Sequence, residues 1–201
     1  MLRFLSFTVC ILLLCSFVRA SEDPLAAGHK PPPTVTGCAY GSDPRQVMDL
    51  WLPPDEADKA PRGLVLFLHG GGFLSGDKSL LPAALLQGCL ERGLVVVAAN
   101  YRFADAVPLP GPMLDAGRAL QHLRAHAEQW NLDPQRAVLL GGSAGAGIAL
   151  WLAFHRDLAD PTSSDPVARQ STRPSCAIVW DAQTSYDPRF IARILGPTAA
   201  R

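Results

Sequence analysis

The sequence predicts an α/β domain, a mostly parallel sheet with helices on both faces. Two observations carry this prediction. Segments of strand length alternate along the chain with segments of helical apolar spacing, which is the order of parallel strands joined by crossover helices. The segments "LVLFL" and "LVVVAA" are continuous apolar runs, as expected for strands that are covered on both faces.

The expected elements follow one another without an internal repeat. Strands are predicted at residues 45–53, 62–70, 94–101, 136–142 and 175–182, and helices at residues 79–93, 111–131 and 143–159. The first strand alternates apolar and polar residues and ends in Pro-Pro, which favours a sheet edge. Residues 160–174 are expected to form a polar loop.

The N-terminal segment is typical of a secretory signal peptide over residues 1–20. Arg3 precedes a short apolar stretch, and small residues lead to a predicted cleavage after Ala20. A membrane anchor is the alternative, but the apolar run is shorter than the ~20 residues that a span needs. We therefore expect a secreted or periplasmic protein, with a Pro-rich linker at residues 21–36 and one partial domain at residues 37–201.

Composition excludes several partners and cofactors. Without the predicted signal peptide, 16 basic residues face 18 acidic ones and no basic run occurs, so neither nucleic acid nor a membrane beyond the export signal is expected as a partner. Cys38, Cys89 and Cys176 remain after cleavage. Export permits one disulfide among them, but the sequence does not choose the pair. No Cys/His cluster has metal-ligand spacing, and no cofactor is implied.

The motif "GGSAG" places Ser143 between a predicted strand and a predicted helix. A sharp turn there holds a serine in a strained conformation with its hydroxyl exposed, and the flanking glycines let the backbone pass closely. The N-terminus of the helix also favours negative charge beside the serine. A Gly/Ala-rich helix start that simply packs against a strand is the alternative explanation.

The second motif, "HGGGF", follows directly after the apolar strand segment "LVLFL". Consecutive glycines allow backbone N–H groups to turn toward one point. The N–H groups of Gly71 and Gly72, together with that of Ala144, are therefore expected to stabilise a developing oxyanion. His69 is expected to hold this loop in shape rather than to transfer protons.

A phosphate-binding loop is the competing interpretation of "GGFLSGDKS". In the pattern G-x-x-x-x-G-K-[ST], the lysine must follow the second glycine directly. Asp77 stands at that position, and Lys78 is displaced by one residue. Because an acid there repels phosphate, nucleotide binding is not expected.

The segments "YGSDPRQVMDLWLP", "HGGGFLSGDK", "NYRF", "LDPQRAVLLGGSAGA" and "AQTSYDP" resemble the α/β-hydrolase fold. The chain is most similar to secreted bacterial esterases and lipases of the hormone-sensitive-lipase and feruloyl/acetyl-esterase groups, from about Tyr40 to Pro188. The resemblance implies hydrolysis of a small-molecule carboxylic ester through an acyl-enzyme on Ser143. It also implies structural roles for four residues of the matching segments, Asn100, Tyr101, Asp133 and Arg136.

The partners of the serine are the open question, because in this fold an acid and then a histidine follow the nucleophile along the chain. Asp181, at the end of the last predicted strand, is a weak acid candidate, and Asp187 suits a turn. None of the five histidines follows Ser143 in a loop that could place it as the general base. They are His29 in the linker, His69 in the glycine loop, His122 and His126 on one helix face, and His155, 12 residues after Ser143. For the pair four residues apart, a solvated helix face is preferred over a metal site.

We therefore expect a truncated α/β-hydrolase that lacks the last strands and helices of the fold, with an incomplete triad. Two hypotheses follow. The first is an esterase-type serine hydrolase by descent, with Ser143 as nucleophile. The second is a non-catalytic α/β-hydrolase-like binding module. Without its base, a serine nucleophile loses most of its rate, although an oxyanion hole alone can leave residual catalysis.

Overall fold

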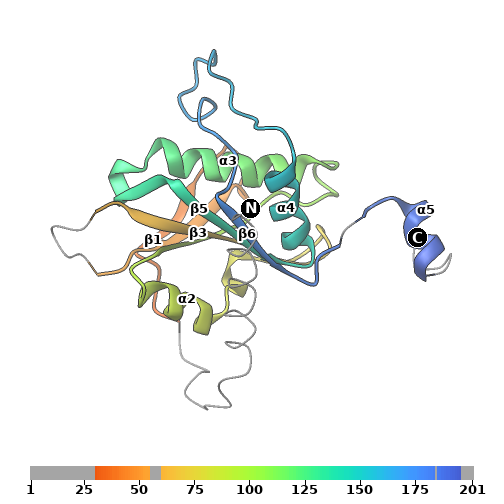
Figure 1. The fold of residues 1–201 in the computed structure, drawn as a ribbon, viewed down its shortest axis with the longest axis horizontal. Coiled ribbons are helices and arrows are strands. Elements are labelled where there is room, and N and C mark those ends of the chain that lie inside the picture. Colours follow the sequence, from red (N-terminus) through yellow and green to blue (C-terminus); the bar gives the residue numbers. More distant parts are fainter. Residues whose placement is uncertain (1–29, 55–59, 184, 196–201) are drawn as a thin grey trace, which may run out of the picture.

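A single six-stranded sheet organises the chain (Figure 1). The computed structural model describes residues 30–54, 60–183 and 185–195, so the predicted signal peptide lies outside the described residues. The strands are β1 (Val35–Ala39), β2 (Val47–Trp51), β3 (Arg62–Leu68), β4 (Val95–Ala99), β5 (Leu132–Gly142) and β6 (Cys176–Trp180). The helices are α2 (Ala83–Leu90), α3 (Gly111–Ala125), α4 (Ala144–Phe154) and α5 (Pro188–Leu195), with short 3-10 turns at Lys78–Leu80 and Glu128–Trp130.

The sheet has the predicted mostly parallel character. Its strand order is β1-β2-β4-β3-β5-β6. β4, β3, β5 and β6 run parallel to one another, whereas β2 is antiparallel to both β1 and β4. Strands β3 and β5 are adjacent although α2, β4 and α3 lie between them in the sequence. The carboxyl ends of β3, β5 and β6 therefore meet at one edge of the sheet.

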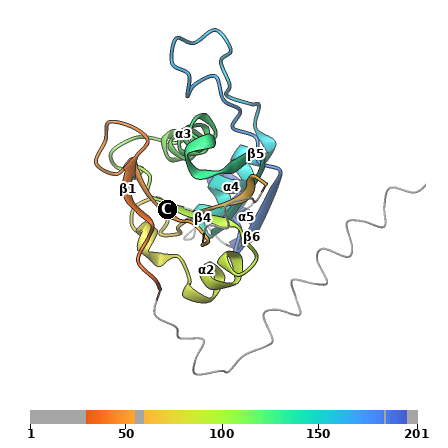
Figure 2. The same cartoon turned by 90° about the vertical axis from the view of Figure 1, so that its left-hand side faces the viewer.

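Each face of the sheet has its own apolar core, because successive side chains of a strand point to opposite faces. In β3, Leu66 belongs to the larger core and Phe67 to the smaller one. α3 and α4 cover the first face and α2 covers the second, as Figures 1 and 2 show from two directions. Both faces of β3 and β4 are thus buried, which explains their continuous apolar sequences.

The predicted edge strand is not at the edge. β2 lies between β1 and β4, and the edge is β1, which begins at Val35 inside the segment predicted to be a linker. Pro31 is also tied to the sheet, since the Trp51 indole N–H donates to its carbonyl at 2.8 Å. The polar residue of the alternating pattern in β2, Asp49, is buried because it accepts from the Gly37 N–H group and pairs with Lys78. β1 gave no clear signal because most of its side chains remain exposed.

Several predicted elements are longer or shorter in the structure. α3 ends at Ala125, and a 3-10 turn and Asn131 in a left-handed conformation (φ 49°) lead directly into β5, which starts four residues before the predicted strand. α4 ends at Phe154, five residues before the predicted end. Asp157 lies in the segment that follows and accepts hydrogen bonds from Ser171 and Thr172, which fold the polar segment back on itself. The extended conformation of His155 ends the helix (φ −71°, ψ 161°).

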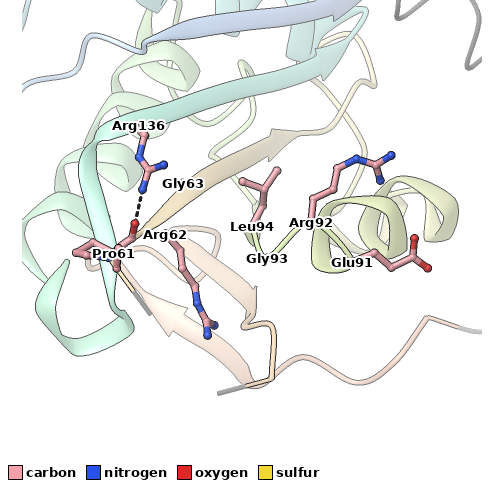
Figure 3. Close-up of a pocket in the computed structure, with 9 residues that line it drawn as sticks. Pro61, Arg62, Gly63, Glu91, Arg92, Gly93, Leu94 and Arg136 are labelled. Atoms are coloured by element: carbon pink, nitrogen blue, oxygen red, sulfur yellow. Dashed lines mark hydrogen bonds between the residues drawn. The ribbon is translucent and has the colours of Figure 1, made fainter. Parts of the chain in front are cut away.

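The described cavities lie at the amino ends of the central strands, far from the carboxyl edge. One of about 470 Å³ is lined by Pro61 and Arg62 at the start of β3, by Arg92 and by Arg136 of β5 (Figure 3). Arg136 donates to the Pro61 carbonyl across this cavity. Arg62 donates to the carbonyl of Pro53 and Arg92 to that of Gly88 in α2, so we explain the cavity as part of the scaffold.

Membrane-spanning helices and disulfides can be assessed for the described residues alone. None of the helices formed by residues 30–54, 60–183 and 185–195 has the length and apolarity of a membrane span. Cys38, Cys89 and Cys176 are all free thiols. The disulfide that export would permit is therefore not formed among them.

Candidate active site

Three adjacent parallel strands end together at the carboxyl edge of the sheet. Leu68, the last residue of β3, pairs with Gly141 of β5, and Gly142 pairs with Trp180, the last residue of β6. The residues after these strands are therefore neighbours in space. Ligands of open α/β sheets bind at this kind of edge. Both sequence motifs, "HGGGF" and "GGSAG", are located here.

Ser143 forms a sharp turn between β5 and α4. Its backbone has φ 51° and ψ −118°, a conformation that non-glycine residues rarely adopt. Two hydrogen bonds fix the turn: the Ser143 N–H donates to the Trp180 carbonyl at 3.1 Å, and its carbonyl accepts from the Gly147 N–H at 3.0 Å. No described residue is hydrogen-bonded to the Ser143 hydroxyl. The strained turn predicted from the motif is thus present, with its side chain available.

The glycines around Ser143 permit close backbone approach. A Cβ on Gly141 would lie 2.5 Å from the carbonyl carbon of Gly145. A Cβ on Gly145 would overlap the carbonyl oxygen of Leu68 and lie 2.8 Å from that of His69. α4 therefore begins directly against the end of β3, at a distance that any side chain would prevent.

The glycine loop after β3 lies beside the serine. A Cβ on Gly70 would be 3.5 Å from the Cβ of Ser143. Gly71 and Gly72 have φ values of 117° and 62°, which glycine adopts readily. The Gly71 carbonyl accepts from the N–H groups of Leu74 and Ser75, both at 3.0 Å, and this turn closes the loop.

Three backbone donors of the two motifs have no acceptor among the described residues. Among the described residues, none accepts a hydrogen bond from the N–H groups of Gly71, Gly72 or Ala144. The Ala144 N–H belongs to the first turn of α4, where donors have no partner within the helix. Gly71 and Gly72 are exposed, whereas Ala144 is buried at the start of α4.

His69 is buried beneath the loop and does not face Ser143 as a proton acceptor. Its ring stacks on Tyr101 at a centroid distance of 4.2 Å. Nδ1 lies 2.7 Å from the Gly70 carbonyl, and Nε2 lies 3.5 Å from a guanidinium nitrogen of Arg45. Arginine can only donate, so Nε2 is the acceptor and the Nδ1–H group donates to Gly70. Burial lowers the pKa of His69, in keeping with this neutral form.

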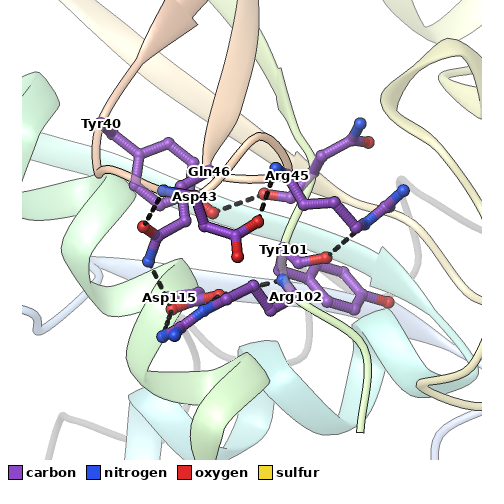
Figure 4. Close-up of polar contacts among 8 residues, drawn as sticks. Tyr40, Asp43, Arg45, Gln46, Tyr101, Arg102 and Asp115 are labelled. Atoms are coloured by element: carbon purple, nitrogen blue, oxygen red, sulfur yellow. Dashed lines mark hydrogen bonds and ion pairs between the residues drawn. The ribbon is translucent and has the colours of Figure 1, made fainter. Parts of the chain in front are cut away.

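A polar network surrounds Tyr101, whose ring stacks on His69, and Figure 4 shows the contact of Arg45 with the Tyr101 carbonyl and that of Arg102 with Asp115. The Tyr101 hydroxyl donates to the His69 carbonyl at 2.7 Å, and Arg45 donates to the Tyr101 carbonyl at 2.8 Å. The guanidinium of Arg102 donates twice to the buried carboxylate of Asp115 on α3, at 2.9 and 2.7 Å, and its backbone N–H donates once, at 2.9 Å. This network links the strand ends to α3 and holds the residues of the glycine loop in place.

The remaining histidines do not reach Ser143. His122 and His126 lie on α3 and stack at 4.2 Å, and His155 follows the last residue of α4 and stacks on Trp151. The pair on α3 is half-buried against Cys38 and Trp130 rather than on the solvated face that we predicted. His29 lies outside the described residues. No cluster of three metal-ligating side chains occurs in the part of the chain that the structure describes.

Asp181 directly follows β6 and is therefore next to the strand end that holds Ser143. Its backbone is in the left-handed region, with φ 50°, and its side chain is exposed. No described residue is hydrogen-bonded to its carboxylate. Asp187, predicted as a turn residue, accepts from Arg189 at the start of α5.

Sequence reasoning missed three contributors to this region. Arg45 lies between His69 and the face of Phe103, 3.7 Å from the ring centroid. The carbonyl of Trp180 anchors Ser143, and Tyr186 lies against Phe73 of the glycine loop. Each contact joins segments far apart in the sequence, and no local motif marks it.

The fold and the paired motifs define the class of protein, an α/β hydrolase. Within that class, the model of the BD-FAE family matches residues 48–187, and the chain belongs to this family. A curated relative, Esterase LipI of Mycobacterium tuberculosis, is 34% identical over 139 residues, which is 69% of this chain and 40% of that protein. The probable isoprenylcysteine alpha-carbonyl methylesterase ICMEL1 of Arabidopsis thaliana is 29% identical, over 67% of this chain and 28% of that protein.

Solved structures show the same relationship. The acetyl ester-xyloside bifunctional hydrolase of Caldicellulosiruptor lactoaceticus is similar with a TM-score of 0.64 and 26% identity, over 86% of this chain and 64% of that one. Native esterase 2 of Thermogutta terrifontis has a TM-score of 0.63 and 25% identity, over 87% and 68%. The chain thus spans two fifths or less of the two curated relatives and about two thirds of these structures.

Proposed function

We propose that this chain carries the nucleophile and the oxyanion hole of a carboxylic-ester hydrolase. Ser143 is the nucleophile, and the backbone N–H groups of Gly71, Gly72 and Ala144 form the oxyanion hole. The observation that carries the proposal is a serine in a strained turn beside the glycine loop, where the N–H groups of Gly71, Gly72 and Ala144 have no acceptor among the described residues. The esterase relatives support the same reaction class.

The chemistry follows from this arrangement. The Ser143 oxygen attacks the ester carbonyl carbon, and the carbonyl oxygen gains negative charge in a tetrahedral intermediate. The bond from this carbon to the alcohol oxygen then breaks, the alcohol leaves with the proton that Ser143 loses, and water hydrolyses the remaining acyl-serine. Backbone donors that are already oriented stabilise that charge, and each is worth ~10²–10³ in rate. His69 has a structural role in the proposal, because its ring atoms are engaged by Gly70 and Arg45.

The mechanism requires a group that accepts the proton of the Ser143 hydroxyl. The Ser143 hydroxyl has no described hydrogen-bond partner, and Asp181 is not joined to a histidine in the described residues. Asp181 remains our candidate for the triad acid because it follows the strand paired with the nucleophile strand. We therefore expect this chain to acylate slowly, since most of the rate of a serine hydrolase depends on its base.

The experiment is active-site labelling of the purified chain. A fluorophosphonate should label Ser143 slowly, and p-nitrophenyl acetate should show weak turnover, with both signals lost in Ser143→Ala. If wild-type protein is not labelled and does not turn over the ester, this chain is not an enzyme. Retained binding of an ester analogue in that case would favour the non-catalytic binding module.

We also propose that the protein is exported, on the evidence of its N-terminal sequence. Expressed with its own N-terminus in a host with a secretory pathway, it should leave the cytoplasm and begin at Ser21. N-terminal sequencing of the product tests this. An uncleaved Met1 terminus in the membrane fraction would instead indicate an anchor.

A further inference from the structure

Tyr186 reaches from the segment after β6 back to the glycine loop. Its ring meets that of Phe73 edge to face, with centroids 5.6 Å apart and an interplanar angle of 68°. Phe73 directly follows Gly72, is 6% exposed and has a φ of 63°. The tyrosine therefore packs on a buried side chain of the segment that holds two proposed oxyanion donors.

Gly147 of α4 provides the second contact. A Cβ at this position would overlap the Tyr186 hydroxyl and lie 3.0 Å from its Cζ. Gly147 comes four residues after Ser143, about one helical turn, and its N–H donates to the Ser143 carbonyl. Glycine is disfavoured inside helices, so its presence here is explained by the space that the tyrosine occupies.

The surroundings of Tyr186 indicate a partly enclosed aromatic side chain. Its ring is 40% exposed, and burial of the remainder raises the pKa of its hydroxyl. Phe190 on α5 has the same exposed fraction, but its described ring contact is with Arg193 of the same helix. Exposure alone therefore does not distinguish the two aromatic residues, whereas contact with the site does.

We propose that Tyr186 is a positioning residue of the active site. Its ring braces Phe73, and its hydroxyl end sits on Gly147. The tyrosine thereby holds the loop that carries Gly71 and Gly72 against the helix that begins after Ser143. The inference rests on the proposed function, because the braced loop is the proposed oxyanion hole.

The first test measures loop stability without using Ser143 chemistry. Hydrogen exchange of the backbone amides of residues 69–76 should become at least about threefold faster in Tyr186→Ala, because the loop loses its brace. Exchange there should stay at the wild-type rate in Phe190→Ala, the control matched in exposure. Unchanged exchange in Tyr186→Ala would overturn the inference even if Ser143 is reactive.

The second test uses the fit between Gly147 and the tyrosine hydroxyl. Gly147→Ala should slow fluorophosphonate labelling of Ser143 about tenfold, because the new methyl group displaces the tyrosine. Tyr186→Phe removes the overlapping oxygen, so the double variant should return to within about threefold of wild type. Gly88→Ala on α2, where only Arg92 lies within 4 Å of the new Cβ, should leave labelling unchanged.

The outcomes separate the two proposals. A wild-type chain that is not labelled overturns the proposed function, and the exchange measurement alone then decides whether Tyr186 braces the loop. A labelled wild type with no rescue in the Gly147→Ala/Tyr186→Phe variant overturns the positioning role, because a general packing defect in α4 would not depend on one hydroxyl oxygen.

Discussion

At the residue scale, the clearest feature is the strain stored at Ser143. Its φ of 51° and ψ of −118° are tolerated because hydrogen bonds to Trp180 and Gly147 fix both sides of the peptide. Non-glycine residues held in such conformations cost ~1–3 kcal/mol and are found most often at functional sites. A substitution that relieves this strain is therefore expected to stabilise the fold while it removes the reactive hydroxyl.

Comparison of Ser143→Gly with Ser143→Ala tests this expectation. Both variants lose the hydroxyl, but only glycine relieves the backbone strain. The free energy of unfolding of Ser143→Gly should therefore be about 1 kcal/mol higher than that of Ser143→Ala, after allowing for the greater freedom that glycine gives the unfolded chain. For a chain of this size, the melting temperature should differ by about 2–4 °C. Equal melting temperatures would show that the turn is not strained in solution.

At the element scale, the start of α4 depends on its contact with the end of β3. In Gly145→Ala, the new Cβ would overlap the Leu68 carbonyl oxygen and lie 2.7 Å from its carbon. These are backbone atoms of a central strand and cannot move aside, so the variant should lose about 2–3 kcal/mol in urea denaturation. Gly88→Ala in α2, which meets no such contact, should instead gain up to about 1 kcal/mol.

Because of His122 on α3, we predict that the free energy of unfolding depends on pH. Burial, then His126 and Arg118, lower the pKa of His122 to about 4, against the opposing charge of Asp165. The folded state thus favours neutral His122, while the unfolded chain takes up a proton near pH 6.5. The contribution of neutral His122 to the free energy of unfolding is therefore complete above pH 6.5 and is lost as the pH falls toward 4.

His122→Phe retains an aromatic ring against His126 but removes the titration. The free energy of unfolding, measured by denaturant titration between pH 7 and 4, should therefore fall less steeply in this variant than in wild type. His155→Phe replaces another stacked imidazole and should keep the wild-type slope. Parallel slopes for all three proteins would show that His122 is not responsible.

The elements that the sequence predicts correctly are those whose residues carry a local pattern. The buried runs of β3 and β4 and the glycine-serine turn at Ser143 were located from sequence, because burial on both faces and close backbone approach leave direct marks in composition. β1 was missed, since an exposed edge strand has no apolar pattern. Tyr186 was missed because its fit to Gly147 depends on tertiary packing across 39 residues.

At the scale of the whole molecule, β6 is the last strand of the sheet among the described residues. Cys176 and Trp180 at its two ends are exposed, Trp180 by 41%. Exposed edge strands pair readily with other chains. The outer edge of β6 is therefore the position from which we expect self-association to arise.

Cys176→Lys should reduce concentration-dependent association, measured by sedimentation velocity in reducing buffer, because a charge on the edge disfavours strand pairing. Cys176→Ser removes the thiol without adding charge and should associate as the wild type does. If the serine variant is as monomeric as the lysine variant, loss of the Cys176 side chain rather than the added charge explains the change, and strand pairing at this edge is contradicted.

The glycines around the serine have a consequence for experiments that map tolerance to substitution. Gly141, Gly145 and Gly147 each lack room for a methyl group, for three different packing reasons: a neighbouring turn, a strand end and a tyrosine. A saturation screen selecting for folded protein would therefore find this stretch intolerant even if the chain had no catalytic activity. Ser143 should be the exception, accepting glycine in a folding screen and failing only in a screen for chemistry.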